Sequence, residues 1–307
     1  MDRLSARTRL LVVAPHPDDE TLATGILIQR VLAAGGTVTV LLLTDGDNNP
    51  WPQRWLERRL LIGAAGRARW AARRRAELCA ALRTLGVDPG QVIAMGWPDQ
   101  GLTRQVACGA PACVDALVPV LARVRPNLLV MPALDDRHPD HGAAHVLMRL
   151  ALERWTERPE VWLYRVHGGR RTARVVVPCV ADATTRERKR AALGCHASQL
   201  VLSGRRMQRF AARSECFEPL EVRSYPQVLP WRPRWSQRPW LRLTAASAGG
   251  GDRWRWRAAP LQHDADGSYR LAARALPEGS GTLFVKLELA LPSIWIFDRW
   301  GWRELHR

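Results

Sequence analysis

His16, Asp18 and Asp19 stand directly after a short apolar run at residues 10–13. A neutral imidazole and a carboxylate are good ligands for zinc, and a catalytic zinc keeps three protein ligands and one open position. A helical pattern begins at residue 21, so the three side chains lie in a predicted strand-to-helix turn. Ligands of open α/β sheets bind at the carboxyl ends of strands, and the cluster stands at such a position.

A second cluster, His138, Asp140 and His141, follows another apolar run at residues 128–132. The segment His-Pro-Asp-His is typical of a helix start, with proline at the first helical position. The two histidines then lie about one helical turn apart and face the same crevice. His141 is the natural third metal ligand, and His145 is a competing ligand further from the strand end. Two such clusters can meet in one crevice, so the pattern predicts a metal-dependent hydrolase.

Some of these residues can also serve purely structural roles. Asp19 can simply favour a helix N-terminus, and a single histidine is usually a satisfied polar contact. A phosphoesterase with two metals needs more carboxylates than the clusters supply. A non-catalytic sugar or nucleotide binder has no use for the spare carboxylate of Asp18, and no Gly-x-Gly-x-x-Gly follows the first strand. The phosphoesterase and the binding module remain as alternatives.

Strand-like and helix-like segments alternate through the first two-thirds of the chain. Strands are predicted at residues 9–14, 37–44, 92–95, 127–132, 161–166 and 174–178, and helices at 21–34, in a long stretch that ends at 85, and at 114–124, 139–154 and 185–193. This alternation predicts an α/β, Rossmann-like fold: a mostly parallel sheet with helices on both faces.

The composition changes near residue 223. Proline and tryptophan become dense, and β-like runs follow at residues 240–244, 253–258 and 282–289. We therefore predict a domain at residues 1–222 and a small β-rich C-terminal extension at 223–307. Its tryptophans either pack the extension against the first domain or form an aromatic platform for a sugar or a membrane interface.

Several motifs resemble the PIG-L/LmbE-like zinc deacetylases. They are Pro-His-Pro-Asp-Asp-Glu at 15–20, Arg-Arg-Ala-Glu at 74–77, Gly-Trp-Pro-Asp-Gln-Gly-Leu at 96–102, His-Pro-Asp-His at 138–141, Lys-Arg-Ala-Ala-Leu at 189–193, His-Ala-Ser-Gln at 196–199 and Glu-Cys-Phe at 215–217. The resemblance covers about residues 8 to 220. It implies removal of an acetyl group from an N-acetylated amino sugar or glycoconjugate.

The resemblance also implies roles for the clusters. His16, Asp19 and His141 would hold one Zn²⁺ per protomer, and Fe²⁺ or Co²⁺ can occupy such a site. Asp18 would be the general base for the attacking water. A protonated His138, oriented by Asp140, would share the developing oxyanion with the metal.

Three further residues would bind substrate in this resemblance. Arg74 and Asp99 would grip sugar hydroxyls or a neighbouring phosphate, and His196 would line the pocket. Each of the first two has a plain alternative, because Arg74 can pair with Glu77 and Asp99 can cap a turn.

The net charge of +17 comes almost entirely from arginine, since only Lys189 and Lys286 are lysines. The arginines are scattered and no recognition motif accompanies them, so nucleic acid is not expected as a partner. The N-terminus lacks an apolar h-region, the six cysteines lack C-x-x-C spacing, and no apolar run reaches the roughly 18 residues of a membrane span. We expect a cytoplasmic protein without a transmembrane segment. Peripheral membrane contact and the oligomeric state stay open.

Overall fold

A seven-stranded sheet forms the centre of the computed structural model, which describes residues 4–168, 177–221, 228–272, 281–290 and 297–305. The strand order is β3-β2-β1-β4-β5-β7-β6. The strands are β1 (Arg9–Ala14), β2 (Thr37–Thr44), β3 (Val92–Trp97), β4 (Leu128–Pro132), β5 (Glu160–Tyr164), β6 (Val177–Cys179) and β7 (Glu215–Pro219). The first five are parallel, whereas β7 runs antiparallel to β5 and β6. The predicted mostly parallel sheet is confirmed; the predicted start of the last strand, residues 174–176, lies outside the described residues.

The sequence of β1 explains its central place. All its residues after Arg9 are buried. Val12 packs into the core on one face of the sheet, and Leu11 and Val13 pack into the core on the other. A strand covered on both faces is a near-continuous apolar run, as this one is.

The chain changes its winding direction at β1 and β4. β1 pairs with β2 on one side and with β4 on the other, in both cases in parallel. In an open α/β sheet this switch point leaves a crevice outside the carboxyl ends of the two strands. The two His/Asp clusters follow these two strand ends.

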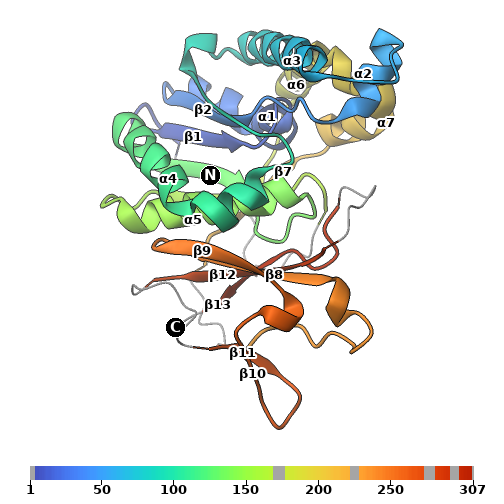
Figure 1. Cartoon of the computed structure of the whole chain (residues 1–307). Coiled ribbons are helices and arrows are strands. Elements are labelled where there is room, and N and C mark those ends of the chain that lie inside the picture. The colour runs from blue at the N-terminus through green and yellow to red at the C-terminus, as the bar shows by residue number, and fades with distance from the viewer. Residues whose placement is uncertain (1–3, 169–176, 222–227, 273–280, 291–296, 306–307) are drawn as a thin grey trace.

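Helices cover both faces of the sheet (Figure 1). They are α1 (Asp19–Ala33), α2 (Pro50–Glu57), α3 (Ala64–Leu85), α4 (Leu102–Val124), α5 (Pro139–Arg154), α6 (Ala183–Cys195) and α7 (Ala197–Ala212), with short 3₁₀ turns at Pro89–Gln91, Arg238–Trp240 and Trp256–Ala258. α4 begins earlier than the predicted residue 114, because the helix continues across a kink at Gly109 despite Pro111. The sequence analysis did not predict α7 or β7.

A second sheet lies against α4 and α5 on the side away from the first sheet (Figure 1). Its antiparallel order is β13-β12-β8-β9, formed by β8 (Leu241–Ser247), β9 (Gly250–Arg255), β12 (Leu283–Leu289) and β13 (Trp302–Leu305), with β10 (Leu261–His263) and β11 (Tyr269–Leu271) as a separate pair. Ala246, Phe284 and Trp302 share one apolar core with α4 and α5. The C-terminal region is β-rich as predicted; the proposed boundary at residue 222 lies outside the described residues.

α4 is long and apolar enough to cross a membrane by length and composition alone. The sequence analysis expected no such segment. In the structure, α4 packs against α5, β8 and β9, and Val114 and Leu117 are fully buried in the shared core. Its apolar residues therefore serve the packing of two layers.

Candidate active site

The turn between β1 and α1 folds His16 and Asp19 onto each other. The His16 backbone N–H donates to Asp19 Oδ2 at 3.0 Å, and the Asp19 N–H donates to the His16 carbonyl at 3.3 Å. Between them, Asp18 has a φ of 131°, which side-chain-bearing residues rarely adopt. Such strain persists only where the surrounding structure imposes it, and it clusters at functional sites.

The turn between β4 and α5 positions two more histidines. His138 is the N-cap of α5: its Nδ1 accepts the Asp140 backbone N–H at 3.3 Å, and Pro139 holds the first helical position. The His138 backbone N–H donates to Asp136 Oδ1 at 3.0 Å. His141, in the first turn of α5, is completely buried.

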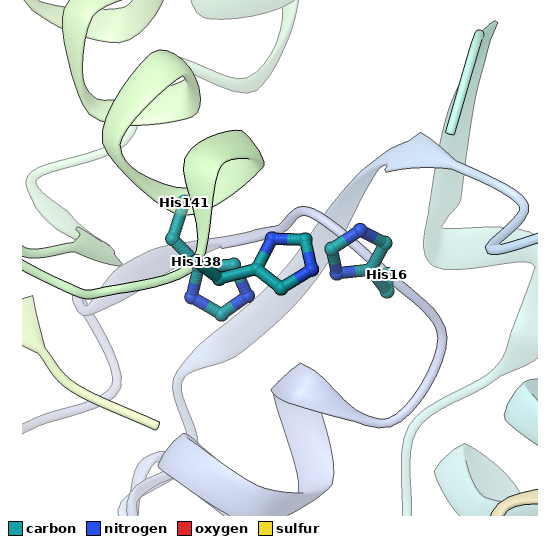
Figure 2. A group of neighbouring side chains, drawn as sticks. All are labelled: His16, His138 and His141. Carbon is teal, nitrogen blue, oxygen red and sulfur yellow. The ribbon is translucent and has the colours of Figure 1, made fainter. Parts of the chain in front are cut away.

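The two turns meet because β1 and β4 lie side by side, and His16, His138 and His141 gather there (Figure 2). Asp19 Oδ2 lies 3.2 Å from His16 Nδ1 and 3.2 Å from His141 Nε2. The centroid of the His138 ring is 4.7 Å from that of His16 and 5.2 Å from that of His141. The structure thus brings together the three expected metal ligands, with His138 beside them.

The buried imidazoles carry nitrogens that the protein itself leaves unused. His16 Nε2 and both ring nitrogens of His141 lack a hydrogen-bond partner with proper geometry among the described residues, although carboxylate oxygens lie 3.2 and 3.3 Å from the His141 nitrogens. Burial by itself lowers the pKa of His141, but the charges of Asp19 and Asp136 overcome this and raise that pKa to about 10. A site that holds a proton so firmly demands positive charge, which a divalent metal ion also supplies. Within the described part of the chain, ligand atoms lie close enough together to hold an ion in three sets: His16–His138–His141, Asp19–His141–His167 and His16–Asp99–Asp140. The expected trio of His16, Asp19 and His141 draws on the first two sets and is linked by Asp19 Oδ2, and two imidazoles with a carboxylate suit such an ion.

Asp136 and His167 also belong to the site, although the sequence analysis gave them no role. Asp136 Oδ2 accepts the backbone N–H groups of Val166 at 2.8 Å and His167 at 3.1 Å, and lies 3.3 Å from His141 Nδ1. These backbone contacts hold a carboxylate beside the Nδ1 edge of the His141 ring. The centroid of the His167 ring lies 4.7 Å from that of His141. One feature of the sequence could have pointed to His167: this histidine stands just after the strand that the structure shows as β5.

Arg74 lines the cavity, and its two terminal nitrogens donate hydrogen bonds to the protein. Its Nη1 donates to the Gly46 carbonyl at 2.8 Å and its Nη2 to the Pro17 carbonyl at 2.6 Å. The same Nη2 lies 3.5 Å from Asp18 Oδ2. Arg74 thus joins the loops after β1 and β2 and stands beside Asp18, while the alternative partner Glu77 instead accepts hydrogen bonds from Ser198.

Asp99 also lines the cavity. One oxygen accepts the Asn48 backbone N–H at 2.7 Å, and the other lies 3.2 Å from His16 Nε2. Burial raises the pKa of Asp99, but its contact with His16 outweighs burial and holds the pKa below its ordinary value. Asp99 is therefore an anionic neighbour of the metal-ligand cluster.

Asp140 does not orient the His138 ring with its carboxylate, as the sequence analysis expected. The carboxylate accepts the backbone N–H groups of Gln100 at 2.7 Å and Leu102 at 3.1 Å, and so fixes the start of α4. Its link to His138 is the backbone N–H that donates to Nδ1. A nitrogen that accepts carries no proton, and burial, aided by the neighbouring imidazoles, holds the His138 pKa well below its ordinary value. His138 is therefore a neutral ring here, not the protonated one expected.

The other two histidines that the sequence analysis named, His196 and His145, do not line the cavity. His196 was expected to line the pocket, but it is 1% exposed, with its Nε2 3.2 Å from Glu20 Oε1 and 3.3 Å from Thr21 Oγ1. This contact with Glu20 of α1 holds the His196 ring in the protein interior. His145 Nδ1 lies 2.9 Å from the Pro132 carbonyl, which explains why this competing ligand does not join the cluster.

A cavity of about 260 Å³ opens over the cluster. Asp18, His138 and His167 line it. α7 adds Arg206, Met207 and Phe210, and the C-terminal region adds Phe297. The site therefore combines elements from both ends of the chain.

Comparisons with known proteins agree with this site. The model of the family described as GlcNAc-PI de-N-acetylase (PIG-L) matches residues 11–152, which include both His/Asp turns. A 1D-myo-inositol 2-acetamido-2-deoxy-alpha-D-glucopyranoside deacetylase of Nocardia farcinica is 31% identical over 268 residues, covering 69% of this chain and 86% of the relative. A deacetylase of the same name from Mycobacteroides abscessus is 30% identical over 234 residues, covering 64% of this chain and 82% of the relative.

A solved structure extends the likeness to the fold. The conserved protein TT1542 from Thermus thermophilus aligns with a TM-score of 0.54 and 25% identity, over 74% of this chain and all (100%) of that one. With its sheet, its paired turns and its relatives in agreement, the chain belongs to the PIG-L family of de-N-acetylases and is a hydrolase that removes N-linked acetyl groups.

Proposed function

We propose that this deacetylase acts on an N-acetylated amino sugar, with Asp18 as the general base and with Zn²⁺ held by His16, Asp19 and His141. The observation that carries the proposal is the single oxygen of Asp19 that lies 3.2 Å from both imidazoles. One carboxylate oxygen shared by two rings marks a point where three ligands can meet. Asp18, the residue before Asp19, lines the cavity from the same turn.

Zinc is favoured by the donor set. Two imidazoles and one carboxylate are common ligands of a catalytic zinc, and Fe²⁺ or Co²⁺ accept the same set. When bound, the metal would polarise the acetamide carbonyl and make a nearby water acidic near neutral pH. Proton transfer and stabilisation of the oxyanion by hydrogen bonding are assigned to side chains of the protein.

Asp18 is suited to accept a proton from the attacking water. Burial raises the pKa of Asp18 to about 6, against the opposing charge of Arg74. A general base works best with a pKa near the operating pH. Its backbone N–H donates to Glu20 Oε2 at 3.0 Å, which helps to fix the strained turn. The same carboxyl group can then return the proton to the departing amine.

His138 is suited to stabilise the oxyanion. Because its Nδ1 accepts the Asp140 N–H, the neutral ring carries its proton on Nε2. That N–H can donate to the carbonyl oxygen as negative charge develops there. Arg74 acts in this scheme as a positioning residue for Asp18, and Asp99 as a neighbour of His16 at the cavity wall.

The substrate class rests on the relatives and on the size of the cavity. The two actinobacterial relatives are named for an inositol-linked acetylated glucosamine. The cavity volume of about 260 Å³ is near the lower end of the roughly 300–1,000 Å³ usual for small-molecule sites. This suits one sugar ring at a time, with the rest of a glycoconjugate outside.

Acetate release with parallel metal analysis tests the proposal. The purified chain should bind about one zinc per protomer and release acetate from N-acetylglucosamine or its inositol-linked form. Chelation should abolish turnover and added zinc should restore it. Full activity in demonstrably metal-free protein would overturn the proposal.

A further inference from the structure

A surface beside the cavity exposes large apolar side chains that the reaction does not use. We call Trp51, Trp55, Leu60 and Leu61 the α2 surface: their exposed fractions are 60%, 68%, 85% and 89%. Single exposed apolar residues are ordinary, but these four, together with the 36% exposed Leu56 between them, make five within residues 51–61 and need an explanation.

The two indoles lie on one face of α2, and Leu60 and Leu61 follow in the segment after this helix. Trp51 and Trp55 are four residues apart and so share a face. Pro52 and Gln53, on the other side of the helix, are buried. A surface helix normally turns its apolar face inward, whereas α2 turns its two indoles outward.

Basic side chains accompany the indoles and leucines. Arg54, Arg58 and Arg59 lie between them in sequence, and the Arg54 guanidinium lies 5.1 Å from the Trp51 ring centroid. Glu57 is the one acidic residue of the segment 50–62, and Gln53 and Arg69 each donate to it at 3.0 Å. Within the part of the chain that the structure describes, Arg54, Arg58 and Arg59 form no ion pair with an acidic side chain.

The α2 surface lies beside the entrance of the cavity. Asn49 caps the N-terminus of α2 and also lines the cavity. α2 packs against α7, which contributes Arg206 and Phe210 to the same cavity (Figure 1). A partner that covered the α2 surface would lie next to the active site.

We propose that the α2 surface docks on an anionic lipid bilayer. Tryptophan and leucine enter the headgroup boundary, and neighbouring arginines attract anionic lipids. Docking brings the cavity to the membrane, where a membrane-borne amino sugar would reach it; that consequence rests on the proposed deacetylase function, whereas docking itself does not.

The bilayer fits better than two other occupants. Leu60 and Leu61 offer aliphatic surface, and nucleic-acid backbones are bound through charge without a need for exposed leucines. In a symmetric dimer through this face, Arg58 and Arg59 would lie near their own copies, and like charges disfavour that contact. An anionic bilayer satisfies both the apolar and the basic side chains.

Co-sedimentation with vesicles tests the proposal on the full chain. The wild type should bind phosphatidylcholine–phosphatidylglycerol vesicles. It should bind vesicles of phosphatidylcholine alone at least about tenfold more weakly. The double variant W51S/W55S should bind the anionic vesicles about tenfold more weakly or worse. Trp235→Ser is the matched control, because it removes an indole that is 80% exposed in the C-terminal region and should leave binding unchanged.

Charge variants separate the two components of docking. R58Q/R59Q should lose most of the preference for anionic vesicles, and R255Q/R257Q, which changes two exposed arginines of the C-terminal region, should keep it. All variants should keep wild-type turnover of a water-soluble acetylated sugar, so a failure of docking is distinct from a failure of the function.

Two outcomes would overturn the proposal. One is equal binding by the wild type, W51S/W55S and Trp235→Ser. The other is a wild type that ignores vesicles but is dimeric in size-exclusion chromatography and becomes monomeric in W51S/W55S. The second result would assign the α2 surface to another copy of the chain.

Discussion

Asp18 combines a strained backbone with a destabilised charge. Its φ of 131° is rare for a residue with a side chain, and burial raises its pKa to about 6. Neither feature helps folding, and both place a carboxylate of moderate basicity at the cavity. The turn therefore gives up some stability to hold a reactive group.

Replacing Asp18 by asparagine isolates that group. Asp18→Asn keeps the size of the side chain and removes its ability to take a proton, so kcat should fall by about 10²- to 10⁴-fold. Metal content should not change, because Asp18 is not among the proposed ligands. Acetate release and metal analysis on one sample decide the matter, and unchanged kcat would remove Asp18 from its role.

The pH dependence of the wild type should reflect the same group. As a base, Asp18 works in its ionised form, so kcat/KM should decline as pH falls through its pKa. Burial raises this pKa to about 6, and any cation bound nearby lowers it. The acidic limb of the profile should therefore lie at or below about pH 6. A limb well above that value would assign the titration to another group.

His138 offers a substitution that separates catalysis from helix capping. Asparagine is a good N-cap, so His138→Asn should preserve the start of α5 and the melting temperature. It removes the Nε2–H donor, and kcat should fall by about 10²- to 10³-fold with little change in metal content. Circular dichroism tests whether the helix cap is preserved, and kinetics tests the loss of the hydrogen-bond donor. Loss of folding in this variant would contradict the assigned cap role.

At the scale of elements, α5 is held from both sides. Its N-terminal turn faces the cavity, and Gly142 faces the second sheet: a Cβ built there would lie 2.7 Å from Trp302 Cδ1 and 3.3 Å from the Leu134 carbonyl oxygen. Glycine lets β13 approach the helix that carries His138 and His141. The helix therefore depends on the C-terminal region for its position.

A pair of glycine substitutions tests this dependence. Alanine normally stabilises a helix relative to glycine by up to about 1 kcal/mol, and Gly204→Ala in α7 should do so, since its nearest neighbour is Leu200 Cβ at 4.0 Å. Gly142→Ala should instead destabilise the protein by about 1–3 kcal/mol through overpacking. Thermal unfolding should shift in opposite directions, and an equal rise in both would show that α5 and β13 are loosely packed.

The elements differ in how far the sequence predicts them. β1, β2 and α5 have their predicted bounds because apolar runs and a proline at the helix start are local signals. The buried residues of α7 include the polar Ser198 and Gln199 as well as Met207 and Ala211, so apolar residues alone do not mark its buried face. The metal-ligand cluster follows from two local motifs, whereas His167 enters only through the pairing of β4 with β5, and the Asp140 contacts only through the loop before α4.

At the scale of the whole molecule, the C-terminal region is built into the catalytic unit. Arg149 of α5 donates to both oxygens of Glu304, at 2.9 and 3.2 Å, and the pair is buried. Glu153 accepts the Thr282 backbone N–H at 3.1 Å. Near the opposite end of α5, the Asp298 N–H donates to the Arg137 carbonyl at 2.8 Å. The second sheet thus contacts α5, the helix that carries the proposed ligand His141, near both of its ends.

These anchors also bring one aromatic side chain to the cavity. Lys286, buried in β12, forms an ion pair with Asp298, the residue after Phe297. The centroid of the Phe297 ring lies 5.5 Å from that of His167 and 6.4 Å from that of His138. Phe297 therefore forms part of the cavity wall beside His138 and His167, and its ring suits the apolar face of a sugar.

Truncating Phe297 tests whether the second sheet contributes to recognition as well as to packing. Phe297→Ala should raise KM for the acetylated sugar by about tenfold, because one apolar pocket contact is worth roughly 1–3 kcal/mol. Metal content should not change, since the ring touches no proposed metal ligand, and any change in kcat should be smaller than the change in KM, although the ring lies against His138. Phe284→Ala is the contrasting variant: that ring lies fully buried between β12 and α5, so its loss should lower the melting temperature and leave KM unchanged. If Phe297→Ala lowered stability without altering KM, the second sheet would act on the active site through the position of α5 alone.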